Sequence, residues 1–87
     1  MVEESVTQLR KGYCDVRGVI KFDPSNPSLF SQFSVYDKDG NYLGIVDPIT
    51  HEGRKILENF NGKYVKFRSS APICRDSETR FFLHLKH

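Results

Sequence analysis

The chain alternates apolar and polar side chains in short segments, which are separated by glycine, proline, asparagine and aspartate. A period of two places the apolar side chains on one face of an extended strand. Residues 13–22 are the clearest case, because Cys14, Val16 and Ile20 fall on one face. Gly18 shares that face, and a glycine inside a strand favours a bend or bulge where a small barrel curls. The pattern therefore predicts a mainly β fold with a curved sheet.

Four further strands are predicted along the chain. They span residues 29–36, 42–46, 63–68 and 80–86. The pair Asp39-Gly40 separates the first two of these and is a strong hairpin signal, because tight hairpin turns need positive φ angles. Residues 23–28 are expected to form a loop, since two prolines there remove backbone donors. Residues 69–79 are expected to form a second, polar loop.

One helix is predicted between the third and fourth strands, near residues 49–60. The apolar positions that follow one helical stripe are Ile49, Gly53, Ile56, Leu57 and Phe60. The helix has two candidate caps at its start, which are Asp47 with Pro48 behind it, or Thr50. Residues 61–62 are Asn-Gly, which tolerates the left-handed conformation that commonly ends a helix.

The length of 87 residues allows one small domain. We expect residues 13–87 to form a five-stranded barrel with the helix between its strands 3 and 4. Residues 1–12 are expected to be an N-terminal extension, either briefly helical or loose, that adds little to the core. The expected core consists of Val16, Ile20, Phe22, Phe33, Val35, Leu43, Ile45, Ile56, Leu57, Phe60, Val65, Phe67, Phe81, Leu83 and Leu85.

Charge and sequence pattern limit the classes of protein that fit. Thirteen Lys and Arg against 11 Asp and Glu leave a net charge of +2, which excludes a histone-like polycation and an acidic disordered segment. No apolar run is long enough to span a membrane, and the N-terminus lacks the apolar segment of a secretory signal. We therefore expect a cytoplasmic protein in which Cys14 is a buried thiol and is not bridged to Cys74.

Three segments, in this order, resemble motifs of the OB-fold. Residues 16–19 resemble its glycine-bent first strand, and residues 33–40 resemble its F-x-V-x-D-x-x-G second strand and hairpin. Residues 62–68 resemble its G-K-x-V-x-V-x-G fourth strand, with Ser69 where a glycine is usual. The plan of five strands with a helix between the third and fourth is also that of an OB-fold. The resemblance covers roughly residues 13–86.

Residues 26–57 are also similar to the HIRAN domain. They carry an Asn-Pro pair at residues 26–27 and then a V-x-D-x-x-G segment that begins at Val35. The aspartate of the HIRAN N-P-x-D stretch is missing, and Val46-Asp47-Pro48 replaces its G-Y-V-P ending. HIRAN domains are small β-barrels that hold single-stranded DNA ends, so both resemblances imply binding to nucleic acid.

Aromatic and cationic side chains interleave on the outward positions of the predicted strands. Such a surface can stack bases on rings and neutralise phosphates. The alternative is that these are ordinary outward strand residues that serve cross-strand pairing alone. An outward Phe82 favours binding, because a phenylalanine outside a small barrel needs a ligand, a partner or a cover. The candidate nucleic-acid-binding residues are Arg17, Lys21, Tyr36, Tyr64, Lys66, Arg68, Phe82, His84 and Lys86.

Catalytic and metal-binding patterns are weak in this chain. Asp37, Asp39 and Asn41 resemble the start of a calcium loop, but Tyr42 and Pro48 stand where that loop needs glycine and glutamate. The histidines and cysteines show no zinc-ligand spacing, and no two carboxylates are placed for acid–base catalysis. We therefore expect a protein that is not an enzyme and uses no cofactor or metal.

Two functions remain open from the sequence. The first is binding of single-stranded nucleic acid, with single-stranded DNA favoured, in DNA replication, repair or recombination. The second is a small protein-interaction subunit of a polymerase, phage or mobile-element assembly, which the modest net charge of +2 favours. The arrangement of charge on the folded surface discriminates between them, because a binder gathers its cations on one face.

Overall fold

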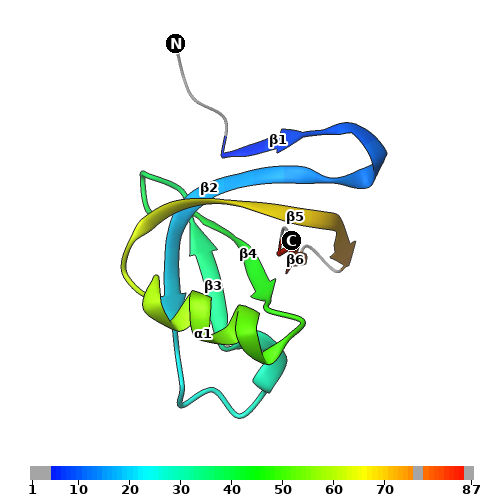
Figure 1. Cartoon of the computed structure of the whole chain (residues 1–87). Helices are drawn as coiled ribbons and strands as arrows, with labels where there is room; N and C mark the ends of the chain where they lie inside the picture. Colours follow the sequence, from blue (N-terminus) through cyan, green and yellow to red (C-terminus); the bar gives the residue numbers. More distant parts are fainter. Residues whose placement is uncertain (1–4, 76–77, 86–87) are drawn as a thin grey trace.

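The structure, a computed structural model, describes residues 5–75 and 78–85, with the backbone alone at residues 11, 30 and 71–75. Figure 1 shows how its strands and helices are arranged. The strands are β1 (Val6–Gln8), β2 (Cys14–Phe22), β3 (Phe33–Tyr36), β4 (Tyr42–Asp47), β5 (Tyr64–Arg75) and β6 (Glu78–Leu83). The helices are the 3-10 turns η1 (Arg10–Gly12) and η2 (Leu29–Ser31) and the α-helix α1 (His51–Asn59).

Five of the strands close into a barrel. The strand order is β2-β3-β4-β6-β5, and β5 pairs with β2 to complete the ring. The pair β4–β6 is parallel, whereas the other pairs are antiparallel. α1 connects β4 to β5 and lies across the lower end of the barrel in Figure 1. The predicted mainly β class, with one helix between the third and fourth barrel strands, is confirmed, and the barrel is compatible with an OB-like fold.

The ends of the chain differ from the prediction. Residues 6–8 form β1, which pairs with β2 through Val6 and Val16, so the prediction of a helical or loose segment is wrong there. The predicted loop at residues 69–79 is also wrong, because β5 continues to Arg75 and pairs with β6. The register of that pair shifts between Ser70 and Ile73, and a bulge of this kind lets a strand carry the proline at position 72.

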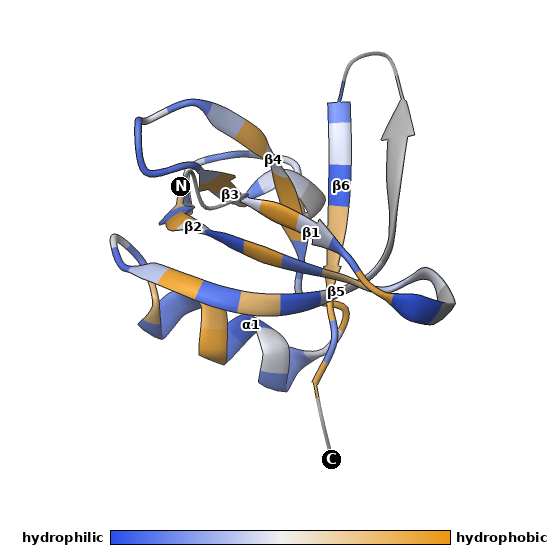
Figure 2. Cartoon of the chain, turned by 90° about the horizontal axis from the view of Figure 1, so that it is seen from above, coloured by the Kyte–Doolittle hydropathy of each residue, from blue (hydrophilic) through white to orange (hydrophobic). Residues whose placement is uncertain are grey.

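Most of the predicted core is confirmed. Apolar and polar residues alternate along much of β2 and β5 (Figure 2), and Val16, Ile20 and Phe67 turn into the barrel. The buried cluster contains Cys14, Val16, Ile20, Phe33, Val35, Val46, Leu57, Phe67, Phe81 and Leu83. Packed against it are Phe22, Leu43, Phe60, Val65 and Leu85.

A bulge in β4 changes which of its residues join the main core cluster. Val35 pairs with Gly44 and Tyr36 pairs with Tyr42, so Leu43 is the extra residue of β4. One extra residue reverses the inward and outward sides of the strand beyond it. Ile45 consequently pairs with the outward Ser34 and lies outside the core cluster, although it is buried. Val46, which the alternation alone placed outside, is a core residue.

Thr50 caps α1, and the alternative cap at Asp47 is wrong. The Thr50 hydroxyl accepts a hydrogen bond from the Gly53 amide at 3.0 Å. Ile49 lies before the helix with a φ of 65° and is 59% exposed, so it does not belong to the buried stripe. The Thr50 amide donates to the Pro48 carbonyl at 2.6 Å, which closes a γ-turn centred on Ile49. Gly53 fits under this turn, because a Cβ there would approach the Pro48 oxygen to 2.4 Å.

Cys14 is fully buried and free of a disulfide, as predicted. Burial raises the pKa of its thiol, an effect that a hydrogen bond with Ser69 partly offsets. Cys74 lies outside the residues whose side chains are described. Within residues 5–75 and 78–85, no helix is long and apolar enough to cross a membrane.

Candidate nucleic-acid interface

Three tyrosines lie in one line across the outer face of the barrel. Tyr42 of β4 pairs with Tyr36 of β3, and Tyr36 pairs with Val19 of β2. Val19 in turn pairs with Tyr64 of β5. We call Tyr42, Tyr36, Val19 and Tyr64 the tyrosine row. It crosses four adjacent strands of the barrel, so three inter-strand steps of about 4.8 Å give it a length of about 14 Å.

The rings of the tyrosine row differ in how much of their surface is free. Tyr64 is 50% exposed and Tyr42 is 46% exposed, whereas Tyr36 is partly buried. The Tyr36 and Tyr42 rings meet edge to face, with their centroids 5.5 Å apart. Lys21 places its Nζ atom 4.5 Å from the centroid of the Tyr36 ring, so a cation covers that ring in the free protein. Tyr64 is therefore the most accessible stacking platform of the row.

Tyr42 was not among the residues that sequence analysis selected. The hairpin between β3 and β4 brings it opposite Tyr36, and residues paired across two strands point to the same face, so both rings lie on the outer face. Its hydroxyl donates a hydrogen bond to Glu78, and burial, together with this carboxylate, raises its pKa. The useful sequence signal was the outward position of Tyr42 directly after the hairpin loop, at the same distance from that loop as Tyr36.

Cations flank the tyrosine row on both sides. On one side Lys21 is exposed and reaches over Tyr36. On the other side Arg17 of β2 pairs across the strands with Lys66 of β5, two residues from Val19 and Tyr64. The Arg17 guanidinium also contacts the Thr7 hydroxyl of β1 at 3.4 Å. The structure thus brings together five predicted residues, which are Arg17, Lys21, Tyr36, Tyr64 and Lys66.

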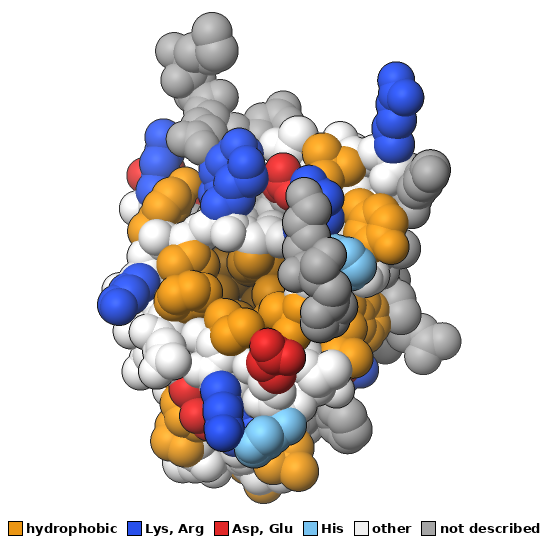
Figure 3. All heavy atoms as spheres, in the orientation of Figure 1, with side chains coloured by type: hydrophobic (Ala, Val, Ile, Leu, Met, Phe, Trp, Pro, Cys, Tyr) orange, Lys and Arg blue, Asp and Glu red, His pale blue; other side chains and the backbone are white. Residues whose placement is uncertain are grey.

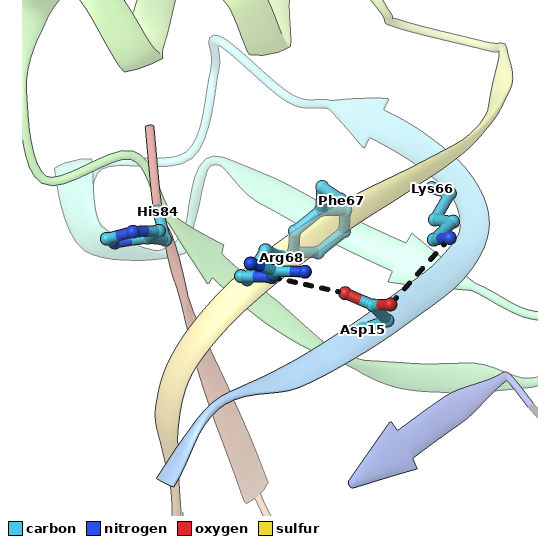
Figure 4. A pocket seen from close by; sticks show the side chains of 5 residues that line it. All are labelled: Asp15, Lys66, Phe67, Arg68 and His84. Atoms are coloured by element: carbon cyan, nitrogen blue, oxygen red, sulfur yellow. Dashed lines mark ion pairs between the residues drawn. The ribbon is translucent and has the colours of Figure 1, made fainter. Parts of the chain in front are cut away.

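An acidic side chain lies among the cations of β5 (Figure 4). Asp15 of β2 pairs across the strands with Arg68, and one of its carboxylate oxygens is 3.5 Å from Nε of that arginine. Its other oxygen is 3.7 Å from Nζ of Lys66. Arg17, Lys21, Lys66 and Arg68 therefore lie on one outer face of the barrel, and the Asp15 carboxylate among them offsets part of their charge.

Asp15, Lys66 and Arg68 line a pocket of about 270 Å³, together with Phe67 and His84. His84 follows β6 and donates its backbone N–H to the Arg68 carbonyl at 2.9 Å. Its ring packs against Tyr13, with centroids 5.0 Å apart. His84 is thus near Arg68 but lies away from the tyrosine row.

Phe82 is not part of the tyrosine row. It lies opposite Ser70 of β5 and Asp47 of β4. Ser70 is six residues further along β5 than Tyr64, about 20 Å at the rise of an extended strand. Sequence analysis placed Phe82 and Tyr64 on one surface because it did not foresee how far β5 continues. Lys86 lies outside the described residues.

A separate apolar surface is visible on the face shown in Figure 3. Apolar side chains surround a hollow between α1 and β5, and lysine and arginine side chains lie above it. Next to α1, a pocket of about 320 Å³ is lined by Ile49, Thr50, Glu52, Leu83, His84 and Leu85. This surface is mainly apolar, whereas the tyrosine row is aromatic and is flanked by cations.

The acidic hairpin loop has a structural role. The Asp37 carboxylate accepts hydrogen bonds from the amides of Asp39 and Asn41, at 2.9 and 2.8 Å, and from the Asn41 side chain. The hydrogen bonds from Asn41, and to a smaller extent that from Asp39, lower the pKa of Asp37. In the part of the chain that the structure describes, no three His, Cys, Asp or Glu side chains are grouped so that they could hold a metal ion.

Comparisons of the chain with protein-family models, with curated proteins and with solved structures find no match.

Proposed function

We propose that this protein binds single-stranded nucleic acid across the outer face of its barrel. The observation that carries the proposal is the tyrosine row, with Lys21 on one side and the Arg17–Lys66 pair on the other. Bases stack on aromatic rings with about 1–3 kcal/mol each and with little regard to sequence. Lysine and arginine beside the rings neutralise the phosphates that accompany the bases.

The row also suggests the direction of the bound strand. The rings follow one another across β4, β3 and β5, so successive bases would be placed across the strands of the sheet and not along one of them. Lys21 would then leave the Tyr36 ring as a base takes its place, and its ammonium would be free for a phosphate. A single cation–π contact at an exposed site is worth about 0.5–1 kcal/mol, which is less than one stacked base contributes. The exchange is therefore favourable.

The setting that we propose is DNA replication, repair or recombination, with single-stranded DNA as the ligand. The resemblance of residues 16–19, 33–40 and 62–68 to OB-fold motifs supports this setting, as does the closed barrel that contains them.

Titration of a fluorescent oligo-dT at two salt concentrations tests the proposal. We expect binding at about 50 mM salt that weakens as salt increases, since bound phosphates release counterions. Replacing Lys66 with alanine should weaken binding and reduce the slope of log affinity against log salt by about 0.7, the single-strand value for one phosphate. Lys55→Ala removes the same charge from an exposed position on α1 and should leave the slope unchanged.

Two outcomes would contradict this prediction. Absence of oligo-dT binding by the parent protein at about 50 mM salt contradicts nucleic-acid binding. Equal changes in slope for Lys66→Ala and Lys55→Ala show that net charge matters and that the face beside the tyrosine row does not.

The second candidate function is protein interaction. The observation that favours it is the apolar hollow beside α1, together with Ile49, which is 59% exposed in a strained turn. If the parent protein does not bind oligo-dT, this surface becomes the first place to search for a partner.

A further inference from the structure

Asp15 lies between two cations of β5. Its two carboxylate oxygens are divided between Lys66 and Arg68, at 3.7 and 3.5 Å (Figure 4). A carboxylate and a phosphate present similar oxygen acceptors to lysine and arginine. The side chain of Asp15 is 14% exposed, whereas those of Lys66 and Arg68 are 56% and 43% exposed. The carboxylate is therefore held on the barrel, while both cationic side chains extend into solvent.

Lys66 and Arg68 both line a pocket on the barrel surface. The pocket of about 270 Å³ opens beside Asp15 and is lined by Lys66, Arg68 and His84, with Phe67 at its inner side. It begins two residues from Tyr64 along β5, which is about 7 Å at the rise of a strand. A phosphate attached to a base stacked on Tyr64 is thus within reach of Lys66.

We propose that this pocket is a phosphate subsite and that Asp15 is a built-in competitor within it. The inference rests on the proposed binding of single strands, whose phosphates would be the ligands. In the free protein the Asp15 carboxylate forms ion pairs with Lys66 and Arg68. In the complex a phosphate binds these two cations instead and is repelled by the Asp15 carboxylate. Asp15 therefore lowers the affinity of this face for polyanions. Base stacking then contributes a larger share of the affinity for single strands.

The charge arithmetic of this face gives the expected effect. Arg17, Lys66 and Arg68 carry three positive charges, and Asp15 leaves a sum of two. Replacing Asp15 with asparagine keeps the shape of the side chain and restores the third charge. We expect affinity to rise about 3- to 10-fold at about 50 mM salt, since each partly exposed ion pair competes only weakly. The salt slope should become steeper by up to about 0.7.

The test uses two ligands, a fluorescent oligo-dT and inorganic polyphosphate, which has phosphates but no bases. Glu58→Gln is the matched control, because Glu58 also forms an ion pair with an arginine, Arg54 at 3.3 Å, and lies on α1. We expect Asp15→Asn to bind both ligands more tightly than the parent and Glu58→Gln to bind like the parent. Asp15→Thr, a second variant suited to a strand, should repeat the gain, and thermal unfolding checks that each variant is folded.

Each outcome decides one of the two claims. Tighter polyphosphate binding by Asp15→Asn and Asp15→Thr, with no gain in Glu58→Gln, supports the competitor even if the parent fails to bind oligo-dT, in which case only the proposed function fails. An unchanged or weaker affinity for polyphosphate, no polyphosphate binding by any variant, or an equal gain in Glu58→Gln overturns the competitor. Oligo-dT binding by the parent that Asp15→Asn leaves unchanged overturns it as well, while single-strand binding stands.

Discussion

Replacing Gly18 with alanine is expected to lower the free energy of unfolding by about 2–4 kcal/mol, at or above the usual cost of overpacking a core. A Cβ atom at this position would lie 2.4 Å from the Tyr36 carbonyl oxygen and 2.7 Å from Cγ2 of Val35. Backbone cannot yield as a flexible side chain does, so β2 and β3 would have to separate. The same close approach holds Tyr36 beside Val19, and the variant should therefore also weaken oligo-dT binding.

Chemical denaturation followed by far-ultraviolet circular dichroism measures this effect. Gly40→Ala is the matched control, because a Cβ at Gly40 meets nothing within 4 Å and the cost comes only from its φ of 86°. That cost is about 1 kcal/mol. If Gly18→Ala proves no more destabilising than Gly40→Ala, then β2 and β3 are not packed as closely as described.

Replacing Tyr64 with alanine is expected to weaken oligo-dT binding by about 1–3 kcal/mol, roughly 5- to 150-fold, because Tyr64 is the most exposed ring of the tyrosine row. The slope of log affinity against log salt should stay nearly unchanged, since a tyrosine ring has no counterion to release. This response differs in kind from that of Lys66→Ala. Titration at two salt concentrations separates the two.

Phe82→Ala is the informative comparison for Tyr64→Ala. Both remove an aromatic ring from an outward strand position, but Phe82 lies about 20 Å along the sheet from Tyr64. We expect a folded Phe82→Ala protein to bind oligo-dT like the parent. A loss at Phe82 equal to the loss at Tyr64 would contradict the tyrosine row as the binding surface.

Local alternation was sufficient to predict the strands that have no irregularity. β2 is buried at every second residue from Cys14 to Ile20, so its face could be assigned from the sequence, and the same holds for Phe33 and Val35 in β3. α1 was predictable from the apolar stripe that includes Leu57. Its start was harder to predict, because the choice between Thr50 and Asp47 depends on a strained turn at Ile49 that no propensity favours.

Bulges account for most of what the sequence did not reveal. The extra residue at Leu43 reverses the sides of β4, so Val46 joins the main core cluster, whereas Ile45 is buried outside that cluster. The irregularity between Ser70 and Ile73 lets β5 pass a proline that would otherwise indicate a loop. Both are decided by the neighbouring strand, so they are tertiary effects that a period count along one segment cannot detect.

In the candidate site, too, some residues could be placed by alternation alone, whereas others depend on the pairing between strands. Tyr36, Tyr64 and Lys66 could be selected because outward alternation within regular strands placed them correctly. The grouping of Phe82 with them failed, because it needed the register between β5 and β6. The alternation that places Cys14 and Val16 inward also places Asp15 outward, but its position between Lys66 and Arg68 depends on the pairing of β2 with β5.

A backbone-amide NMR titration of the parent protein with oligo-dT tests the central claim most directly. We predict that the largest shifts follow the tyrosine row and its flanking cations, at Val19, Tyr36, Tyr42, Tyr64 and Lys66. The amides of α1 and Phe82 should remain at their free positions. Shifts confined to α1 and to Leu83 and Leu85, or no shifts at all at about 50 mM salt, would contradict single-strand binding by this face.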